Sequence, residues 1–127
     1  MEETRFERGV RVQNMKRDPS RPPLDIKPTD EREPIDMFIT EFVHGDIYSR
    51  GVISMREREM VTVTVYIVLS QPQFIEGHLR AAFNLGMTKE ELEEVIIQTI
   101  PFAGFSKAII AMQCLKTVVK QREEQGK

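Results

Sequence analysis

The sequence predicts an all-α protein, a single-domain bundle of about six helices. Two observations favour helices. Apolar residues recur at intervals of three and four in several segments, and the pattern Ser/Thr-x-x-Glu stands before two of these segments. A third observation limits the size, because 127 residues can form one hydrophobic core but not two. We therefore expect one domain over residues 1–127.

The composition argues against two classes of partner. The formal net charge is −2 and the basic residues are dispersed, so the chain has no electrostatic footprint for nucleic acid. No apolar run approaches the roughly 20 residues that span a bilayer. The first residues, Met1 to Arg5, lack the basic-then-apolar layout of a signal peptide. We expect a cytoplasmic protein that binds neither nucleic acid nor membrane.

The few thiol and imidazole groups argue against metal and disulfide chemistry. The single cysteine, Cys114, excludes an internal disulfide framework, a Cys-x-x-Cys pair and a multi-thiolate metal site. Its neighbours Met112, Leu115 and Val118 favour a buried, inert thiol over a reactive one. Two histidines, His44 and His78, are too few to favour a histidine-rich zinc site. We expect no metal.

The N-terminal segment predicts a helix followed by a long connection. A helix is expected over residues 3–16, with Phe6, Val10 and Met15 on one face among charged residues. Residues 17–33 contain four prolines and many charges, which favours an extended, exposed segment. Such a connection is long for a compact domain, so packing on a neighbouring subunit and mobility are both open.

Pro34 favours the start of the next helix, because proline fits the first helical turn. The expected apolar stripe of this helix is Met37, Phe38, Phe42 and Val43. Gly45 predicts a break in it. Residues 46–51 predict a short helical turn that ends at Gly51.

Local signals conflict in the next segment. The run from Val61 to Val68 is β-branched and alternating, which alone favours a strand. Ser54-x-x-Glu57 fits a capping box, and the length of the apolar run and the helices on both sides favour a helix. We expect a helix from about residue 55 to residue 70.

Three further helices are expected after Gln71-Pro72. The first covers residues 73–85 and stops at Gly86, and its predicted inner face is Phe74, His78, Ala81, Ala82 and Leu85. Thr88-x-x-Glu91 is a second capping box, and the helix behind it carries the clearest stripe: Leu92, Val95, Ile96, Thr99 and Ile100.

Pro101 is expected to end this helix, and Ala103-Gly104 to allow two backbones to approach closely. A long last helix follows, with a predicted inner face of Phe105, Ile109, Met112, Leu115 and Val119. Residues 120–127 form a polar tail that we expect to fray.

Two protonatable side chains are predicted at core-facing positions. His78 belongs to an apolar face, and it is either a core histidine satisfied by one hydrogen bond or a general acid–base. Glu59 is either a solvated charge near a helix N-terminus or part of a polar line with Thr62 and Tyr66. Such a line is costly to bury without partners, and His78 could be the partner of Glu59.

Arginines near this pair are candidates for substrate binding. Arg56, Arg58 and Arg80 could each hold a carboxylate through the guanidinium fork, and surface ion pairing is the alternative for each. We expect Arg58 and Arg56, together with Tyr66, to bind the substrate if the chain is an enzyme.

An ordered set of residues resembles the carboxymuconolactone decarboxylase family, which includes the alkylhydroperoxidase D-like proteins. The resemblance covers about residues 38–120 and rests on Arg58-Glu59-Met60, His78-x-x-Ala81-Ala82-x-x-x-Gly86-x-Thr88-x-x-Glu91-x-x-Glu94-Val95 and Ala103-Gly104-Phe105. It implies an all-α, alkylhydroperoxidase D-like fold that assembles as a homotrimer or homohexamer. It also favours a helix over residues 61–68.

The resemblance implies a Glu–His proton relay at Glu59 and His78. In the alkylhydroperoxidase branch a Cys-x-x-Cys pair precedes the histidine, and here those positions hold Gln71 and Phe74. Neither side chain forms a thiolate, so that peroxidase mechanism is not available to this chain.

The decarboxylase branch also lacks the cysteine pair. The resemblance then implies a carboxy-lyase that removes CO₂ from a small carboxylated lactone or related acid without metal or organic cofactor. His78 would donate the proton, and Glu59 would orient His78 or shuttle the proton. Two alternatives stay open: a peroxidase that uses Cys114 alone, and an oligomer that binds a small molecule without catalysis.

Overall fold

The computed structural model describes residues 2–127, and within that range it contains helices and no strand. This confirms the all-α prediction. The chain divides into two compact units, Met1–Met55 and Arg56–Lys127. Each unit is described by itself below. The single domain over residues 1–127 and the homo-oligomer both stay predictions. No helix in the described range is long and apolar enough to cross a membrane.

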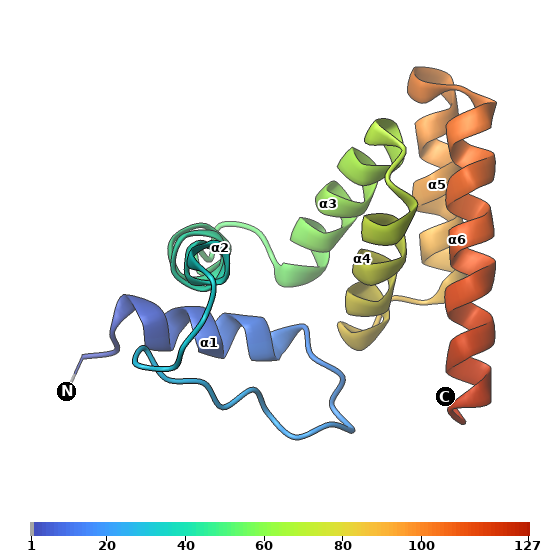
Figure 1. Cartoon of the computed structure of the whole chain (residues 1–127). Helices are drawn as coiled ribbons and strands as arrows, with labels where there is room; N and C mark the ends of the chain where they lie inside the picture. The colour runs from blue at the N-terminus through green and yellow to red at the C-terminus, as the bar shows by residue number, and fades with distance from the viewer. Residues whose placement is uncertain (1) are drawn as a thin grey trace. The chain divides into compact units, whose positions relative to one another are not determined.

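The first unit pairs α1 (Arg5–Met15) with a helical rod made of α2 (Pro34–Phe38) and the π-helix η1 (Ile39–Tyr48) (Figure 1). The helix α1 starts with a reciprocal capping box between Thr4 and Glu7. Its buried residues are Phe6, Gly9 and Val12. The predicted inner position of Met15 is wrong, because its side chain is 49% exposed.

The connection between α1 and α2 contains only turns and irregular backbone, as predicted. Asn14 ties it to α1, because its side chain accepts a hydrogen bond from the Leu24 amide at 2.7 Å and donates one to the Leu24 carbonyl at 3.3 Å. The middle of the connection is therefore tied to α1.

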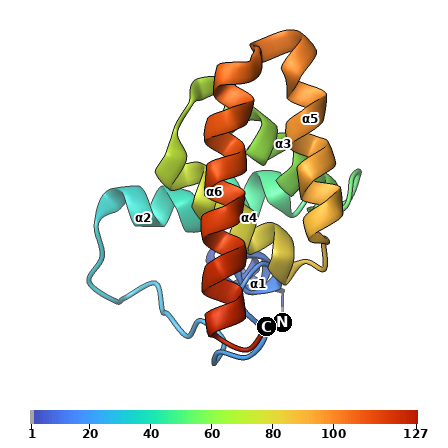
Figure 2. The same ribbon diagram turned by 90° about the vertical axis from the view of Figure 1, so that its right-hand side faces the viewer.

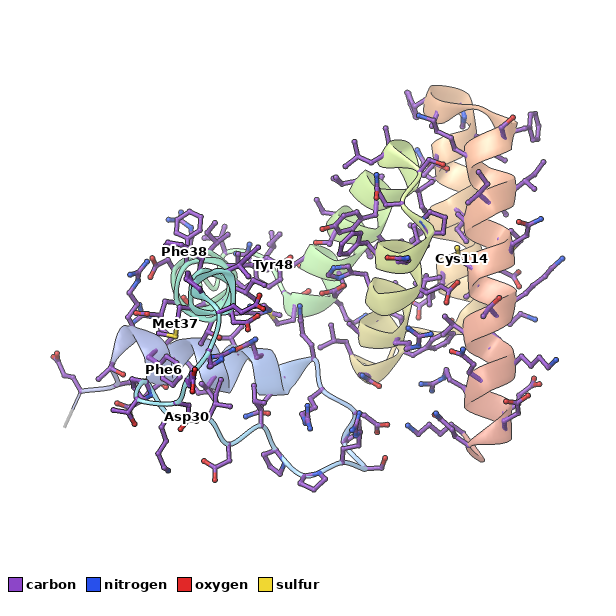
Figure 3. The ribbon with its side chains drawn as sticks, in the orientation of Figure 1. Phe6, Asp30, Met37, Phe38, Tyr48 and Cys114 are labelled. Carbon is purple, nitrogen blue, oxygen red and sulfur yellow. The ribbon has the colours of Figure 1, made fainter. Side chains whose placement is uncertain are left out.

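The predicted break at Gly45 is wrong, since Gly45 lies inside η1. The predicted apolar stripe is wrong as well. Phe38 is 67% exposed (Figure 3) and Phe42 is 49% exposed, and the residues of η1 that are buried are Thr40, His44 and Gly45. The buried face of this rod consists of small and polar residues because α1 packs closely against it.

Gly9 is the residue that permits this close packing. A Cβ atom at Gly9 would lie 2.0 Å from the Thr40 carbonyl oxygen, and one at Gly45 would lie 2.8 Å from the Arg5 carbonyl oxygen. Both neighbours are backbone atoms, so neither contact can be relieved by turning a side chain. The two glycines are therefore required by the helix crossing and not by a turn.

The substitution Gly9→Ala is expected to lower the free energy of unfolding by about 1–3 kcal/mol, since the added methyl forces the two backbones apart. Gly77→Ala is the matched control, because nothing lies within 4 Å of the added atom and it sits inside a helix. That control is expected to leave stability unchanged or raise it slightly. Urea unfolding followed by circular dichroism measures both, and equal stability of the two variants would contradict the packing described here.

The second unit contains α3 (Met55–Leu69), which starts at the unit boundary, α4 (Pro72–Asn84), α5 (Lys89–Ala103) and α6 (Phe105–Glu124). In Figures 1 and 2, α5 and α6 lie side by side and run in opposite directions. The buried core of this unit draws on all four helices: Val63, Ile67, Ile75, Leu79, Ala82, Met87, Leu92, Val95, Ile96, Ala108, Ala111, Cys114, Leu115 and Val118.

The segment with conflicting signals is helical, as predicted. In α3, Glu59, Val63 and Ile67 are all 0% exposed, and their spacing of four places them on one face. The other valines of the run, Val61, Val65 and Val68, are 58%, 48% and 41% exposed. The alternation that favoured a strand therefore comes from β-branched residues on both faces of a helix.

The inner faces of α4 and α6 are each displaced from the prediction. The buried residues of α4 are Ile75, Leu79 and Ala82, so Phe74 and His78 stand beside the core and not in it. The buried residues of α6 are Ala108, Ala111, Cys114, Leu115 and Val118. Phe105 and Ile109 are more than half exposed. The polar tail is helical as far as Glu124.

The signals around α5 are confirmed in part. Thr88 and Glu91 form the predicted capping box, Gly86 has a φ of +89°, and the predicted stripe is buried apart from Ile100, which is partly buried. Pro101 does not end the helix, which continues to Ala103. Gly104 ends it at φ +89°, and a Cβ there would meet nothing within 4 Å. The predicted backbone approach at Gly104 is therefore wrong, and the positive φ explains the glycine.

Candidate active site

Glu59 of α3 and His78 of α4 meet in the second unit. Atom Nδ1 of His78 lies 3.0 Å from Oε2 of Glu59. The Glu59 side chain is 0% exposed, whereas the His78 side chain is 23% exposed. The sequence predicted this pairing, and the structure brings the two residues together. An imidazole that solvent can reach is thus backed by a carboxylate that solvent cannot reach.

The turn between α3 and α4 sets the pair in place. Ser70 adopts φ 55°, the Ser70 amide donates to the Ile67 carbonyl, and the Gln71 amide donates to the Tyr66 carbonyl. The Lys107 ammonium donates to the Val68 carbonyl at 2.6 Å, which satisfies one of the last carbonyl groups of α3. Pro72 then opens α4 in its first turn. The turn is therefore held by backbone hydrogen bonds and by a cation from α6.

The charge of Glu59 decides the direction of its hydrogen bond with His78. A carboxylate removed from water is stable only when it is paired and hydrogen-bonded. When Glu59 is ionised it only accepts, and His78 then donates from Nδ1. Atom Nε2 is then the remaining ring nitrogen of His78.

A row of stacked rings adjoins the pair and was not predicted. The Tyr66 ring is stacked on His78 with centroids 5.2 Å apart and planes 18° apart. It is also stacked on Phe74, at 5.1 Å and 17°. The sequence analysis placed Phe74 in the core, but it is 51% exposed. The aromatic residues at i and i+4 of α4 were the signal that could have indicated this row.

The remaining polar residues of the predicted line have local partners. The Thr62 hydroxyl donates to the Arg58 carbonyl at 2.9 Å, within α3. The residue before Glu59, Arg58, is half-buried. Of the predicted substrate-binding residues, Tyr66 contacts the pair through its ring, which is stacked on His78.

Arg56 is engaged elsewhere. Its guanidinium forms an ion pair with Glu91 and lies 3.4 Å from the Gly86 carbonyl oxygen. The Glu91 carboxylate also accepts from the Thr88 amide, and together these contacts hold the pKa of Glu91 below its usual range. Arg56 therefore joins the start of α5 to α3, and the structure does not bring it to Glu59 or His78.

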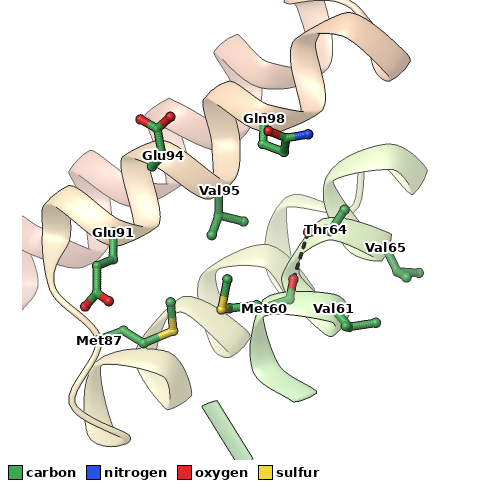
Figure 4. A pocket seen from close by; sticks show the side chains of 9 residues that line it. All are labelled: Met60, Val61, Thr64, Val65, Met87, Glu91, Glu94, Val95 and Gln98. Atoms are coloured by element: carbon green, nitrogen blue, oxygen red, sulfur yellow. Dashed lines mark hydrogen bonds between the residues drawn. The ribbon is translucent and has the colours of Figure 1, made fainter. Parts of the chain in front are cut away.

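A cavity of about 620 Å³ lies between α3 and α5 (Figure 4). Its lining residues are Met60, Val61, Thr64, Val65, Met87, Glu91, Glu94, Val95 and Gln98. Thr64 does not present a free hydroxyl to it, because that hydroxyl donates to the Met60 carbonyl at 2.7 Å. Glu59 and His78 are not among the lining residues, so this cavity is not the place where the pair acts.

Cys114 is buried at 4% exposure on α6 (Figure 3), as predicted. Burial raises the pKa of its thiol, and the charge of Glu76 acts in the same direction. The sulfur lies 3.7 Å from the Pro72 carbonyl oxygen. These surroundings disfavour the thiolate, the form that reacts with peroxides. Within residues 2–127, no group of three or more His, Cys, Asp or Glu side chains is arranged to hold a metal ion.

Comparison with known proteins places this helical chain in a family. The model of the carboxymuconolactone decarboxylase family matches residues 35–117, across both units. The chain belongs to that family, which confirms the resemblance drawn from the sequence.

Two curated relatives carry decarboxylase names. The 4-carboxymuconolactone decarboxylase of Acinetobacter baylyi is 36% identical over 83 residues, which cover 65% of this chain. The nitrosuccinic acid decarboxylase of Metarhizium robertsii is 24% identical over 90 residues, or 69% of this chain. The matched region spans 62% of the length of each relative.

Proposed function

We propose that this protein is a carboxy-lyase that removes CO₂ from a small carboxylic acid and protonates the resulting carbanion, with no metal or organic cofactor. The observation that carries the proposal is the buried Glu59 carboxylate bonded to the partly exposed His78 imidazole. Family membership and the names of both curated relatives support the reaction type.

The named substrates of the two relatives suggest the class of acid. One is a carboxylated unsaturated lactone and the other is a nitro-substituted dicarboxylic acid. In both, a carbonyl or nitro group can delocalise the electron pair that remains after a carboxylate leaves as CO₂. The substrate would then supply its own electron sink, and the protein would supply binding and a proton.

In the proposed reaction the bond between carbon and the carboxylate breaks, CO₂ departs, and the electron pair stays on the substrate as a delocalised carbanion. The Nε2–H of a doubly protonated His78 then donates its proton to carbon, which leaves a neutral imidazole. For a carboxylated unsaturated lactone the double bond shifts as the proton arrives. Solvent returns the proton to His78 before the next turnover.

Glu59 has two roles in this proposal. Its hydrogen bond to Nδ1 holds the imidazole so that Nε2 is presented to the substrate. Its negative charge, shielded from water, stabilises the imidazolium that donates the proton. We propose Arg58, the residue before Glu59 on α3, as the cation for the substrate carboxylate.

The direct test is an assay with 4-carboxymuconolactone at neutral pH without added metal. Loss of its absorbance together with release of one CO₂ per substrate molecule is the expected result. Absence of CO₂ release from this acid and from nitrosuccinic acid would contradict the proposal for both named substrate types. Peroxide reduction without CO₂ release would instead support the peroxidase alternative, against which the surroundings of Cys114 argue.

A further inference from the structure

We propose that Tyr66 and Phe74 are positioning residues that fix the plane of the His78 imidazole and thereby direct its Nε2 atom. The observation is the continuous stack in which Tyr66 is shared by Phe74 and His78, with planes within 18° of each other in both pairs. The expected effect on catalysis rests on the proposed proton-donor role of His78. The orientation of the ring is independent of that role.

The hydrogen bond to Glu59 constrains the imidazole only in part. It fixes the place of Nδ1, 3.0 Å from Oε2, and leaves the ring able to turn about the direction of that bond. The χ2 torsion of histidine has broad minima, so the side chain itself does not select one plane. Rotation of the ring would move Nε2, which is the atom that must face the substrate.

Tyr66 supplies the second constraint. With planes 18° apart and centroids 5.2 Å apart, the imidazole cannot turn far without losing its contact with the phenol ring. One hydrogen bond and one stacked face together determine both the position and the plane of the ring. The direction of Nε2 then follows.

Phe74 holds Tyr66 in the same way. Phe74 and His78 lie one turn apart on α4, so their side chains share a face of that helix. Tyr66, from α3, contacts both of them. Phe74 is 51% exposed and is therefore not a core residue, and its ring stacks on the Tyr66 ring. The buried residues Ile67, Ile75 and Leu79 fix the two helices beneath the stack.

The test compares Tyr66→Leu, Tyr66→Phe and Phe74→Leu with the wild-type protein. Tyr66→Phe keeps the stacking ring and removes only the hydroxyl, so it is the matched control for the spectra. The first readout is the ¹H–¹⁵N spectrum of the histidine rings. The chain has two histidines, and the signals that disappear in His78→Gln identify His78. The second readout is kcat and KM for 4-carboxymuconolactone.

Wild type and Tyr66→Phe are expected to give one sharp set of His78 ring signals. Tyr66→Leu is expected to give broadened or doubled signals, with kcat about 10-fold to 100-fold lower and KM within about twofold, because misplacing a reacting group affects the chemical step. Phe74→Leu should change both readouts in the same direction by less.

Two results would overturn the proposal. One is an unchanged His78 spectrum in Tyr66→Leu, and the other is the same change of that spectrum in Tyr66→Phe and Tyr66→Leu, which would assign the effect to the hydroxyl. The spectra require no substrate. If wild-type protein releases no CO₂, the proposed function fails while the spectra still decide whether the stack orients the ring.

Discussion

Replacing His78 with glutamine is expected to lower kcat for decarboxylation by about 10³-fold, which corresponds to about 4 kcal/mol of transition-state stabilisation. Glutamine keeps a polar side chain of comparable reach, and its amide cannot donate a proton to carbon at neutral pH. The His78 side chain is 23% exposed and contributes little to core packing, so the variant should remain folded. The measurement is steady-state release of CO₂ from 4-carboxymuconolactone.

Gln73→Ala is the matched control for that substitution. Gln73 lies on the same helix and is exposed, so its removal should leave kcat unchanged. Thermal unfolding of both variants separates lost chemistry from lost structure. A His78→Gln protein that is folded and retains wild-type kcat would contradict the proton-donor role.

Replacing Glu59 with glutamine is expected to lower kcat by about 10²-fold, since removing the group that orients a functional histidine typically weakens activity on this scale. Glutamine preserves the volume of the 0% exposed side chain and removes its charge. The imidazolium of His78 would lose the anion that stabilises it, and the hydrogen bond at Nδ1 would lose its charge assistance.

Stability distinguishes this effect from a purely structural one. Glutamine keeps the volume of Glu59 and can still hydrogen-bond to His78, and the imidazole that loses its charged partner is partly exposed to solvent, so Glu59→Gln should keep its unfolding midpoint. Glu94→Gln removes an exposed carboxylate from α5 and serves as the control for loss of a negative charge. If Glu59→Gln unfolds more readily but turns over normally per folded molecule, Glu59 has a structural role only.

The sequence was sufficient to predict the pair because His78 lies in a clear helical pattern, and a capping signal and the family resemblance favoured a helix around Glu59. The predicted polar line of Glu59, Thr62 and Tyr66 is costly to bury without partners, and this pointed to His78 as the partner of Glu59. The helix cap at Thr88 and the positive φ at Gly86 were predictable because each depends on a few neighbouring residues. These features depend on residues close in sequence.

The features that the sequence did not predict depend on residues distant in sequence. Gly45 alone suggested a helix break. The reason for a glycine inside η1 is its contact with the backbone of α1, which is distant in sequence. The predicted inner face of α6 is wrong in part because it was assigned to the large apolar residues, whereas the helix buries the small residues Ala108 and Ala111. The ring stack joins two helices, so neither helix indicates it alone.

The central claim is that Glu59 and His78 deliver a proton to one face of a carbanion formed by loss of CO₂. The most direct test is a reaction of 4-carboxymuconolactone in D₂O, with the product examined by mass spectrometry and ¹H NMR before it exchanges with solvent. The account predicts one deuterium at carbon in a single configuration. Release of CO₂ with deuterium in both configurations would show that water protonates a free carbanion, and would contradict it.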